Sequence, residues 1–388
     1  MKLDIVSALY GLEPGGAEIS TRILAQELGR LGVDLEVVST RPAAVGEPCG
    51  VVLEPLDRVP YWAILWLGNR VLDRLFKAAL IRRWERRRPD VVLIEDHMSL
   101  IGAVAAVEEL RKRGQNIALA MTQLWEVDTE FFFKYRPWPI AFVLVYRFRK
   151  ANQLDRRMDF VNGVTAYLRK RVVDRLGVAP ERCGIYYTIA IKEGPKLEAP
   201  PPARPLILAP GRINPEKGSL FFYEVVRELA ARRRDFDALF LGGGPYEKGL
   251  RRRIERDGLG DVCSISGSIP YEQFVRKYAE ATVVAAPIMY PCGYTRVVLE
   301  SLYAGKPVIT FDQGSMPEII VDGKTGFRIP PHSVEKFADA CERFIDDPAL
   351  ASNMSDDCRQ TAIDHADLAV AARGLLDRLE RIRAERAG

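Results

Sequence analysis

Short apolar runs alternate with amphipathic segments along the first half of the chain. The apolar runs are rich in Val, Ile and Leu and have the length of buried strands, at residues 3–10, 34–40, 90–96 and 116–122. The segments between and after them repeat apolar residues every three or four positions, as helices do, at residues 17–31, 99–113 and 167–176. Strands that alternate with helices in this way form a parallel sheet with helices on both faces.

The same alternation restarts after residues 192–205, a stretch rich in proline and charge that we interpret as a linker. Strands are predicted at residues 205–213, 237–244, 262–269, 282–288 and 306–312, and helices at residues 220–233, 271–279, 296–305 and 334–347. The sequence therefore predicts two doubly wound, Rossmann-like α/β domains, residues 1–191 and 206–365. A last helix, within residues 366–388, is expected to pack back on the N-terminal domain.

Composition fits two globular domains and excludes several classes of protein. The chain has 388 residues, of which 48% are hydrophobic and 28% charged, with a net charge of +4 that does not indicate nucleic-acid binding. Its six cysteines form no CxxC pair, so we expect neither a zinc site nor a disulfide framework, and a cytoplasmic, reducing location. Asp4 interrupts the first apolar run, so no signal peptide is predicted, and no apolar stretch is long enough to span a bilayer.

Glycines follow several predicted strands, at the places where phosphates bind to α/β proteins. Gly15 and Gly16 open the first predicted helix, and a glycine at a strand-to-helix turn often marks a phosphate on the helix N-terminus. After the first strand of the second half, Gly211 permits a tight turn, and Arg212 and Lys217 place two cations on one loop. An ordinary turn with surface charges is the alternative for this loop.

Two further segments of the second half suit a nucleotide. The stretch 239–250 carries three glycines between a strand and a helix, which let backbone N–H groups approach an anion, although glycines also serve ordinary turns. Residues 293–296 open a predicted helix whose free amides suit a phosphate. Glu300, one turn further along, suits the hydroxyls of a ribose, and the alternative is a solvated carboxylate on the helix surface.

His97 follows a predicted strand in the first half, where active-site groups of parallel sheets gather. We favour a functional role for it over packing. Glu95 and Asp96 precede it and are candidates to orient it or to act as acid or base, but a solvated loop is the favoured interpretation of this pair. The acidic run at residues 235–237 is interpreted as a polar loop, and no metal site is predicted.

Two segments of the first half mix aromatic residues with arginines. In residues 61–88, Trp62, Trp66 and Phe76 have basic residues nearby, a pattern that suits an anionic membrane surface. A core helix with a charged outer face is the alternative, and the more favoured one. Residues 131–150 follow a predicted strand and are candidates to line an acceptor pocket.

The order of these motifs resembles the retaining family 4 glycosyltransferases of GT-B fold. The second half contains "GRINPEKG", "GGGP", "RVVLESLYAGKPVI" and "MPEIIVDGKTGFRIPP" in that order, and the first half contains "PGGAE" and "IEDHMS". The resemblance implies two domains that face each other across a cleft. It also implies transfer of a sugar, with retention of configuration, from a UDP- or GDP-sugar to a saccharide, lipid-linked or small-molecule acceptor. No cofactor besides this donor substrate, and no metal, is expected.

The resemblance also implies roles for single residues. Arg212 and Lys217 would hold the donor diphosphate, Glu300 the ribose hydroxyls, and His97 would reach the donor sugar from the first domain. We therefore assign catalytic roles to His97, Arg212 and Lys217, and donor binding to Gly15, Gly16, Gly211, Gly243, Ser268, Ile269, Cys292, Gly293, Tyr294, Thr295, Arg296 and Glu300.

The chain departs from the family pattern at the sugar end of this site. The family usually has a second glutamate eight positions before the one that matches Glu300, and Cys292 stands there instead. In the related glycogen-synthase variant "EPCGLT", the acid falls at the position of Tyr290. The missing carboxylate normally contacts hydroxyls of the donor sugar, and a hydrogen bond to a charged group contributes about 1.5–3 kcal/mol. We therefore expect an altered sugar preference, and keep a sugar-nucleotide epimerase and a non-catalytic GT-B subunit as alternatives.

Overall fold

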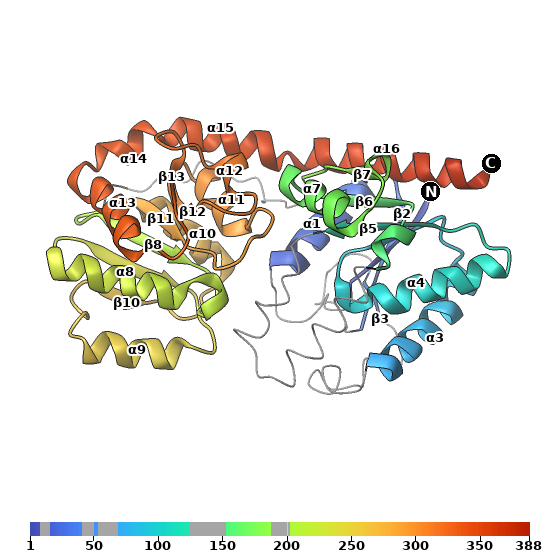
Figure 1. Cartoon of the computed structure of the whole chain (residues 1–388), viewed down its shortest axis with the longest axis horizontal. Coiled ribbons are helices and arrows are strands. Elements are labelled where there is room, and N and C mark those ends of the chain that lie inside the picture. The colour runs from blue at the N-terminus through green and yellow to red at the C-terminus, as the bar shows by residue number, and fades with distance from the viewer. Residues whose placement is uncertain (8–15, 41–49, 53–68, 124–152, 188–199, 201) are drawn as a thin grey trace. The chain divides into compact units, whose positions relative to one another are not determined.

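The computed structural model describes the chain except for residues 8–15, 41–49, 53–68, 124–152, 188–199 and 201. The chain divides into two compact units (Figure 1). Unit 1 comprises Met1–Ala190 and Asp367–Gly388, and unit 2 comprises Ile191–Ala366.

Unit 1 contains a parallel sheet of seven strands in the order β3-β2-β1-β4-β5-β6-β7. The strands are β1 Lys2–Val6, β2 Asp34–Ser39, β3 Gly50–Val52, β4 Val91–Ile94, β5 Ala118–Gln123, β6 Phe160–Gly163 and β7 Cys183–Gly184. The helices are α1 Gly16–Arg30, α3 Asn69–Arg87, α4 His97–Lys112, α7 Ala166–Leu176 and α16 Leu368–Ala387.

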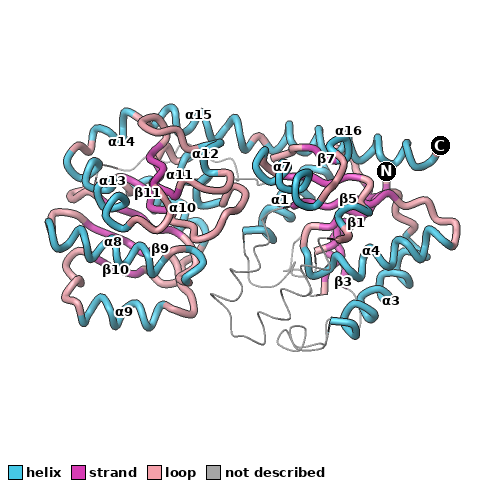
Figure 2. Tube along the Cα trace, in the orientation of Figure 1, coloured by secondary structure: helices cyan, strands magenta, loops and turns pink. Residues whose placement is uncertain are grey.

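Alternate residues of these strands feed two hydrophobic cores, one on each face of the sheet. In β1, Val6 joins the core beneath α3, α4 and α7, whereas Leu3 and Ile5 join the core beneath α1 and α16. In α16, Leu375 and Leu379 recur at the spacing of one helical face and lie in the second core. The sheet therefore lies between helices, as the colours of Figure 2 show.

Unit 2 repeats the plan with a parallel sheet of six strands in the order β10-β9-β8-β11-β12-β13. The strands are β8 Leu206–Pro210, β9 Asp237–Leu241, β10 Cys263–Ile265, β11 Val283–Ala286, β12 Val308–Phe311 and β13 Gly326–Ile329. The helices are α8 Ser219–Arg232, α9 Glu247–Arg256, α10 Tyr271–Glu280, α11 Arg296–Tyr303, α12 Met316–Ile319, α13 Val334–Asp346, α14 Ala349–Asn353 and α15 Ser355–Ala366. The predicted α/β fold with parallel sheets in both halves is confirmed.

Each sheet has one point where the order of strands reverses. In unit 1 the chain proceeds from β1 outward to β2 and β3, and then returns to place β4 on the other side of β1. In unit 2 it proceeds from β8 to β9 and β10, and then places β11 beside β8. The connections at such a switch point leave in opposite directions, so a ligand finds room at the carboxyl ends of the two strands.

The helix α3 belongs to the core of unit 1. Phe76 is 4% exposed, and its side chain lies where a Cβ atom on Gly102 of α4 would touch it at 3.0 Å. The less favoured interpretation, in which Phe76 faces a membrane, is therefore wrong, and the favoured interpretation of a core helix holds for this residue. Trp62 and Trp66 lie outside the described residues. Within the described part of the chain, no helix is long and apolar enough to cross a membrane.

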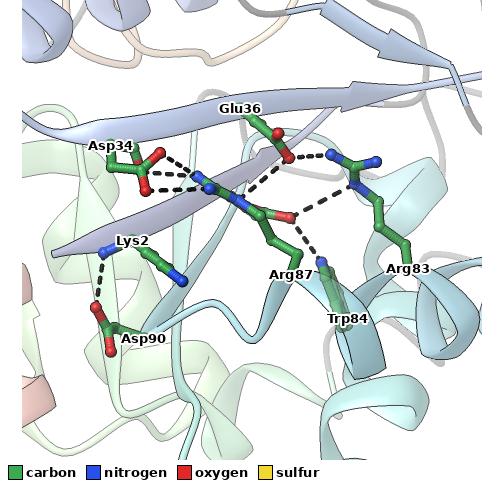
Figure 3. Close-up of polar contacts among 8 residues, drawn as sticks. Lys2, Asp34, Glu36, Arg83, Trp84, Arg87 and Asp90 are labelled. Atoms are coloured by element: carbon green, nitrogen blue, oxygen red, sulfur yellow. Dashed lines mark hydrogen bonds and ion pairs between the residues drawn. The ribbon is translucent and has the colours of Figure 1, made fainter.

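A carboxylate is buried in β1, beneath α3. Asp4 accepts a hydrogen bond of 2.8 Å from the indole of Trp84, and Arg87 approaches it at 3.4 Å. Arg87 also forms a bidentate pair with Asp34 at the start of β2, and Figure 3 shows Arg83 and Arg87 directed from α3 toward the acidic side chains of β2. Burial raises the pKa of Asp4 to about 6, although the Trp84 hydrogen bond lowers it. This network holds α3 against the sheet.

Candidate functional site

The two loops at the switch point of unit 2 are joined through Lys217 and Tyr290. The loop after β8 ends in a short 3-10 turn, Pro215–Lys217, whose backbone is capped by the Asn214 side chain at 2.9 Å. The loop after β11 carries Tyr290. Lys217 Nζ donates to the Tyr290 hydroxyl at 3.1 Å and lies 5.4 Å from the centre of its ring. The backbone N–H of Met289 also donates to the Glu216 carbonyl at 3.2 Å.

Close backbone contact at this point requires a glycine that sequence reasoning did not single out. Gly218 has φ of +75°, and a Cβ atom there would overlap the carbonyl oxygen of Pro287. The glycine therefore lets the loop after β8 lie directly against the loop after β11. This contact fixes the position from which the Lys217 side chain starts.

Two titratable groups near the Lys217 ammonium, Tyr290 and Cys292, are uncharged at neutral pH, and the carboxylate of Glu216 also acts on it electrostatically. Burial raises the pKa of Cys292 to about 11 and raises that of Tyr290 above its usual 10.0. Burial also lowers the pKa of Lys217, but its interactions with Tyr290, Cys292 and Glu216 outweigh this effect, so the pKa lies above the usual 10.5. Lys217 is thus a charged ammonium beside two neutral groups. Arg212, on the same loop, is exposed to solvent.

The glycine-rich turn after β9 lies between two other loops of unit 2. Ile213 donates its backbone N–H to the Gly243 carbonyl at 2.9 Å, and a Cβ atom on Gly243 would overlap the hydroxyl of Ser268. Gly242, with φ of +132°, packs equally closely on the carbonyl of Gly211. The structure thus brings together the predicted residues Gly211, Gly243 and Ser268, with Ile269 next along the chain. Close packing requires glycine at positions 242 and 243, and the φ of +127° favours it at Gly211, so these glycines do not by themselves indicate an anion.

Glu300 lies in a buried cluster rather than on a solvated surface, so the alternative of a solvated carboxylate is wrong. Its side chain and that of Arg296, one turn earlier in α11, are each 7% exposed, and Arg296 Nη2 donates to Glu300 Oε1 at 2.7 Å. Tyr271 donates to the same oxygen at 2.8 Å, and Tyr278 donates to Oε2 at 3.2 Å. Arg296 Nη2 also donates to the Tyr271 hydroxyl at 2.8 Å.

Sequence reasoning missed the two tyrosines that hold Glu300. They stand seven residues apart in α10, which is two helical turns, so both hydroxyls project from the same face. Two tyrosines at that spacing, on the helix that follows the Ser268 loop, are the signal that was available. Nothing in the sequence pattern of α10 indicates that this face lies against α11.

The remaining motif residues, from Cys292 to Thr295, contact the C-terminal part of unit 2. The carbonyl of Cys292 accepts from the backbone N–H of Ser315 at 3.0 Å. Tyr294 donates its hydroxyl to Glu318 at 3.1 Å, and its ring meets His365 edge-on. Thr295 has an extended backbone and precedes α11, and its side chain does not cap the helix. Gly293 is buried.

The switch point of unit 1 holds buried polar groups. Glu95, directly after β4, is 6% exposed and accepts a hydrogen bond of 2.8 Å from Thr122 of β5. The interpretation of Glu95 as part of a solvated loop is therefore wrong. Burial raises the pKa of Glu95 to about 7, although the Thr122 hydrogen bond lowers it.

Asp96 and His97 build the start of α4 beside Glu95. The Asp96 side chain caps the helix by accepting from the backbone N–H of Ser99 at 2.8 Å. His97 is the first residue of the helix and is 4% exposed. Burial lowers its pKa to about 4, so the ring is neutral at pH 7. A neutral imidazole both donates and accepts hydrogen bonds, as a sugar hydroxyl does.

Parts of the sequence prediction fall outside the described residues. Gly15 and all of residues 131–150 lie outside the described residues, whereas Gly16 is the first residue of α1. Asp235, in the acidic run 235–237, pairs with Arg233 at 2.7 Å before β9 begins. Among the residues that the structure describes, no group of three or more His, Cys, Asp or Glu side chains is arranged to hold a metal ion.

Two family sequence models match adjoining parts of the chain. The model described as Glycosyltransferase Family 4 matches residues 14–188, and the model described as Glycosyl transferases group 1 matches residues 192–363. The first range covers the sheet of unit 1 from α1 to β7, without β1 and α16, and the second covers the sheet of unit 2.

Several characterised proteins are similar in sequence. The chain is 24% identical to a D-inositol 3-phosphate glycosyltransferase of Streptomyces avermitilis, over 92% of this chain and 80% of that protein. It is 33% identical to the alpha-D-kanosaminyltransferase of Streptomyces kanamyceticus, but over only 39% of each chain. A GDP-mannose-dependent alpha-(1-6)-phosphatidylinositol monomannoside mannosyltransferase of Mycolicibacterium smegmatis is 30% identical over 42% of this chain and 44% of that protein.

Solved structures share the fold over almost the whole chain. The sucrose-phosphate synthase of Thermosynechococcus elongatus superimposes with a TM-score of 0.79 at 18% identity, covering 99% of both chains. Anabaena HepE, solved in complex with UDP-glucose, superimposes with a TM-score of 0.76 at 18% identity, over 98% of this chain and 100% of that one. At such identities the likeness concerns the fold alone.

Proposed function

The chain belongs to the family 4 glycosyltransferases of GT-B fold, and on that premise we propose that it moves a sugar from a UDP- or GDP-sugar to an acceptor with retention of configuration. The acceptor is a saccharide, a lipid-linked molecule or a small molecule. The names of its relatives support this breadth, because they include an inositol phosphate and a phosphatidylinositol mannoside as acceptors. The name of one relative specifies GDP-mannose as donor, and HepE was solved with UDP-glucose.

The observation that carries the proposal is the charged ammonium of Lys217 at the switch point of unit 2. A nucleoside diphosphate gains negative charge as the bond to its sugar breaks, and a fixed cation at that position stabilises the charge. Lys217 is held by Tyr290 at 3.1 Å, and Arg212 extends from the same loop. With two side-chain cations available for the diphosphate, we propose that the reaction needs no metal ion.

We assign the nucleoside to the loops beside this cation. Gly211, Gly243 and Ser268 lie together, with Ile269 following, and this cluster is proposed to hold the base end of the donor. Glu300 is the proposed partner of the ribose hydroxyls. Its Oε1 already accepts from Arg296 and Tyr271, and its Oε2 accepts from Tyr278. A carboxylate oxygen accepts about two hydrogen bonds, so Oε2 has capacity for a ribose hydroxyl.

Unit 1 is proposed to supply the sugar and acceptor contacts. His97 is neutral at pH 7, so it exchanges hydrogen bonds with sugar hydroxyls without adding charge. Retention would follow from attack on the same face of the sugar, with the departing phosphate accepting the proton of the acceptor hydroxyl. We also propose a cytoplasmic location, since the cysteines of the described residues are buried free thiols. Because Phe76 is buried, it does not support peripheral membrane contact through residues 61–88.

The test is incubation with UDP- and GDP-sugars, with and without candidate acceptors, while free UDP or GDP is measured. We expect release of one nucleoside diphosphate that accelerates with an acceptor and persists in EDTA, and a product with the anomeric configuration of the donor. An epimerase would convert the donor without releasing the nucleotide. A non-catalytic subunit would bind a nucleotide without turnover, and either result would overturn the proposal.

A further inference from the structure

We propose that Tyr290 is a positioning residue for Lys217: its hydroxyl holds the ammonium in place for the donor diphosphate without cancelling its charge. This inference rests on the proposed function. It concerns the place where the family pattern has a carboxylate and this chain has Tyr290 and Cys292.

The end of the lysine side chain contacts Tyr290 in two ways. Lys217 Nζ donates to the Tyr290 hydroxyl at 3.1 Å and lies 5.4 Å from the centre of the same ring. A lysine side chain has four rotatable bonds, so an unrestrained ammonium would sample many positions. A hydrogen bond and a cation–π contact from one rigid ring restrict that sampling.

The loops that carry the two residues are themselves fixed. Gly218 packs against the Pro287 carbonyl, and Met289 donates its backbone N–H to Glu216 at 3.2 Å. The contact between Lys217 and Tyr290 therefore spans two loops that start from adjacent strands, β8 and β11. Its position is determined by the sheet and does not depend on the flexibility of either loop.

The neutrality of Tyr290 is what makes this arrangement suited to an anion. Among the described residues, the Lys217 ammonium donates a hydrogen bond to this phenol, and the carboxylate of the adjacent Glu216 acts on the ammonium electrostatically. The nearby thiol of Cys292 is also uncharged at neutral pH. A carboxylate at position 290 would lie within reach of the ammonium and would reduce the net positive charge there. With the phenol in that place, the charge of Lys217 is not offset by its hydrogen-bond partner.

Two substitutions at position 290 distinguish the positioning of the Lys217 ammonium from the preservation of its charge. Tyr290→Phe keeps the ring and removes the hydroxyl, so we expect kcat to fall about tenfold while the affinity for UDP or GDP changes less than threefold. The reason is that charge on the diphosphate is greatest in the transition state, where the position of the cation matters most. Tyr290→Glu should instead weaken UDP or GDP binding at least tenfold at pH 8. Relative to the wild type, that binding should recover as the pH falls and the new carboxyl group becomes protonated.

A double-mutant cycle tests whether Tyr290 acts through Lys217. Adding Tyr290→Phe to a Lys217→Met protein should cause no further loss of kcat, because the side chain that Tyr290 holds is gone. A loss of equal size in both backgrounds would mean a merely structural role and would overturn the inference. Tyr223→Phe is the matched control, because it removes the hydroxyl of another buried tyrosine of unit 2, one that contacts Asp257 in a different region. It should leave kcat and nucleotide affinity unchanged.

The measurements are calorimetry with UDP and with GDP, and kcat with the sugar nucleotide that the wild type turns over. If the wild type binds neither nucleotide and releases none, the proposed function fails. If the wild type is active and Lys217→Met is impaired, but Tyr290→Phe matches the wild type, only this inference fails. Should Tyr290→Phe melt below the assay temperature, the pH dependence of Tyr290→Glu decides the question, and an affinity ratio to wild type that does not change with pH counts against the inference.

Discussion

The switch point of unit 2 presents a permanent positive charge, whereas that of unit 1 presents groups that are neutral or titrate near pH 7. In unit 2, Lys217 is held by a neutral phenol after β11. In unit 1, Glu95 has a pKa of about 7 and the neighbouring His97 one of about 4, both through burial. The two points have the same topology, with a central strand whose neighbours are reached in opposite directions.

The comparison shows that the fold determines where a ligand site lies, whereas the loop residues determine which ligand it suits. A parallel sheet directs the loops after its central strands to one edge in both units. Whether that edge suits an anion or an uncharged ligand depends on which side chains follow the strands. We expect unit 2 to bind the charged part of the donor and unit 1 the hydroxyl-rich part and the acceptor. The following predictions test this division.

Removal of the cation should have the largest effect. Lys217→Ala should lower kcat/KM by roughly 10²–10³-fold, the usual loss when one preorganised electrostatic contact to a transition state is removed. Calorimetry should show weaker binding of UDP or GDP with little change in the melting temperature. Lys306→Ala, at a partly buried lysine elsewhere in unit 2, is the control and should retain activity. Unchanged nucleotide affinity in Lys217→Ala would contradict the assignment of charge to unit 2.

The next largest effect should come from the ribose contact. Glu300→Gln removes the charge that faces Arg296 and weakens acceptance from a ribose hydroxyl, so affinity for UDP or GDP should fall about tenfold. The loss should be much smaller for the 2′-deoxy nucleotide, which lacks one of the hydroxyls. Equal losses for both nucleotides would mean that Glu300 serves only the buried cluster with Tyr271 and Tyr278.

Titration of Glu95 in unit 1 should change the free energy of unfolding with pH. The pKa of Glu95 is raised from 4.5 to about 7 in the folded chain, so its contribution is present below pH 4.5 and is lost as the pH rises through 7. At 1.36 kcal/mol per pKa unit the loss approaches about 3 kcal/mol. Glu95→Gln should therefore lose less free energy of unfolding than the wild type between pH 5 and pH 8, as measured by urea titration.

A second variant sharpens this test. The hydrogen bond from Thr122 lowers the pKa of Glu95, so Thr122→Val should move the pH-dependent loss to a higher pH. Asp4, with a pKa of about 6, contributes in the same direction and should leave part of the pH dependence in both variants. Identical profiles for the wild type and Glu95→Gln would mean that the Glu95 carboxyl is not buried in solution.

The smallest effect should come from Tyr271, whose hydroxyl occupies Glu300 Oε1. Tyr271→Phe frees Oε1 to accept from the second ribose hydroxyl, in addition to the one proposed at Oε2, so UDP or GDP should bind about twofold to threefold more tightly. Tyr246→Phe, at an exposed tyrosine without a side-chain role in the cluster, should not change the affinity. Weaker binding in Tyr271→Phe would indicate that the tyrosine orients Glu300 for the ribose instead of competing with it.

Elements with a clear hydrophobic period were predictable, and elements without one were missed. β4, β8 and α13 appear close to their predicted ranges, because their apolar residues repeat at strand or helix spacing. β6 was missed because its four residues include the buried Asn162, and α9 was missed because it buries only Leu250 and Ile254 among charged residues. In both cases neighbouring elements supply the stabilisation that the segment's own pattern does not display.

The sequence by itself determined that the chain forms two parallel α/β units and that Lys217, Glu300 and His97 belong to their carboxyl edges. Only the tertiary structure decided which groups these residues meet. Tyr290 lies 73 residues from Lys217, and Tyr271 lies 29 residues from Glu300, and each pair meets across neighbouring elements of unit 2. Periodicity fixes which face of a segment is buried, but the partner on the other side depends on strand order and helix packing. For the same reason, the burial that moves the pKa of Glu95 to about 7 belongs to the folded chain and to no local pattern.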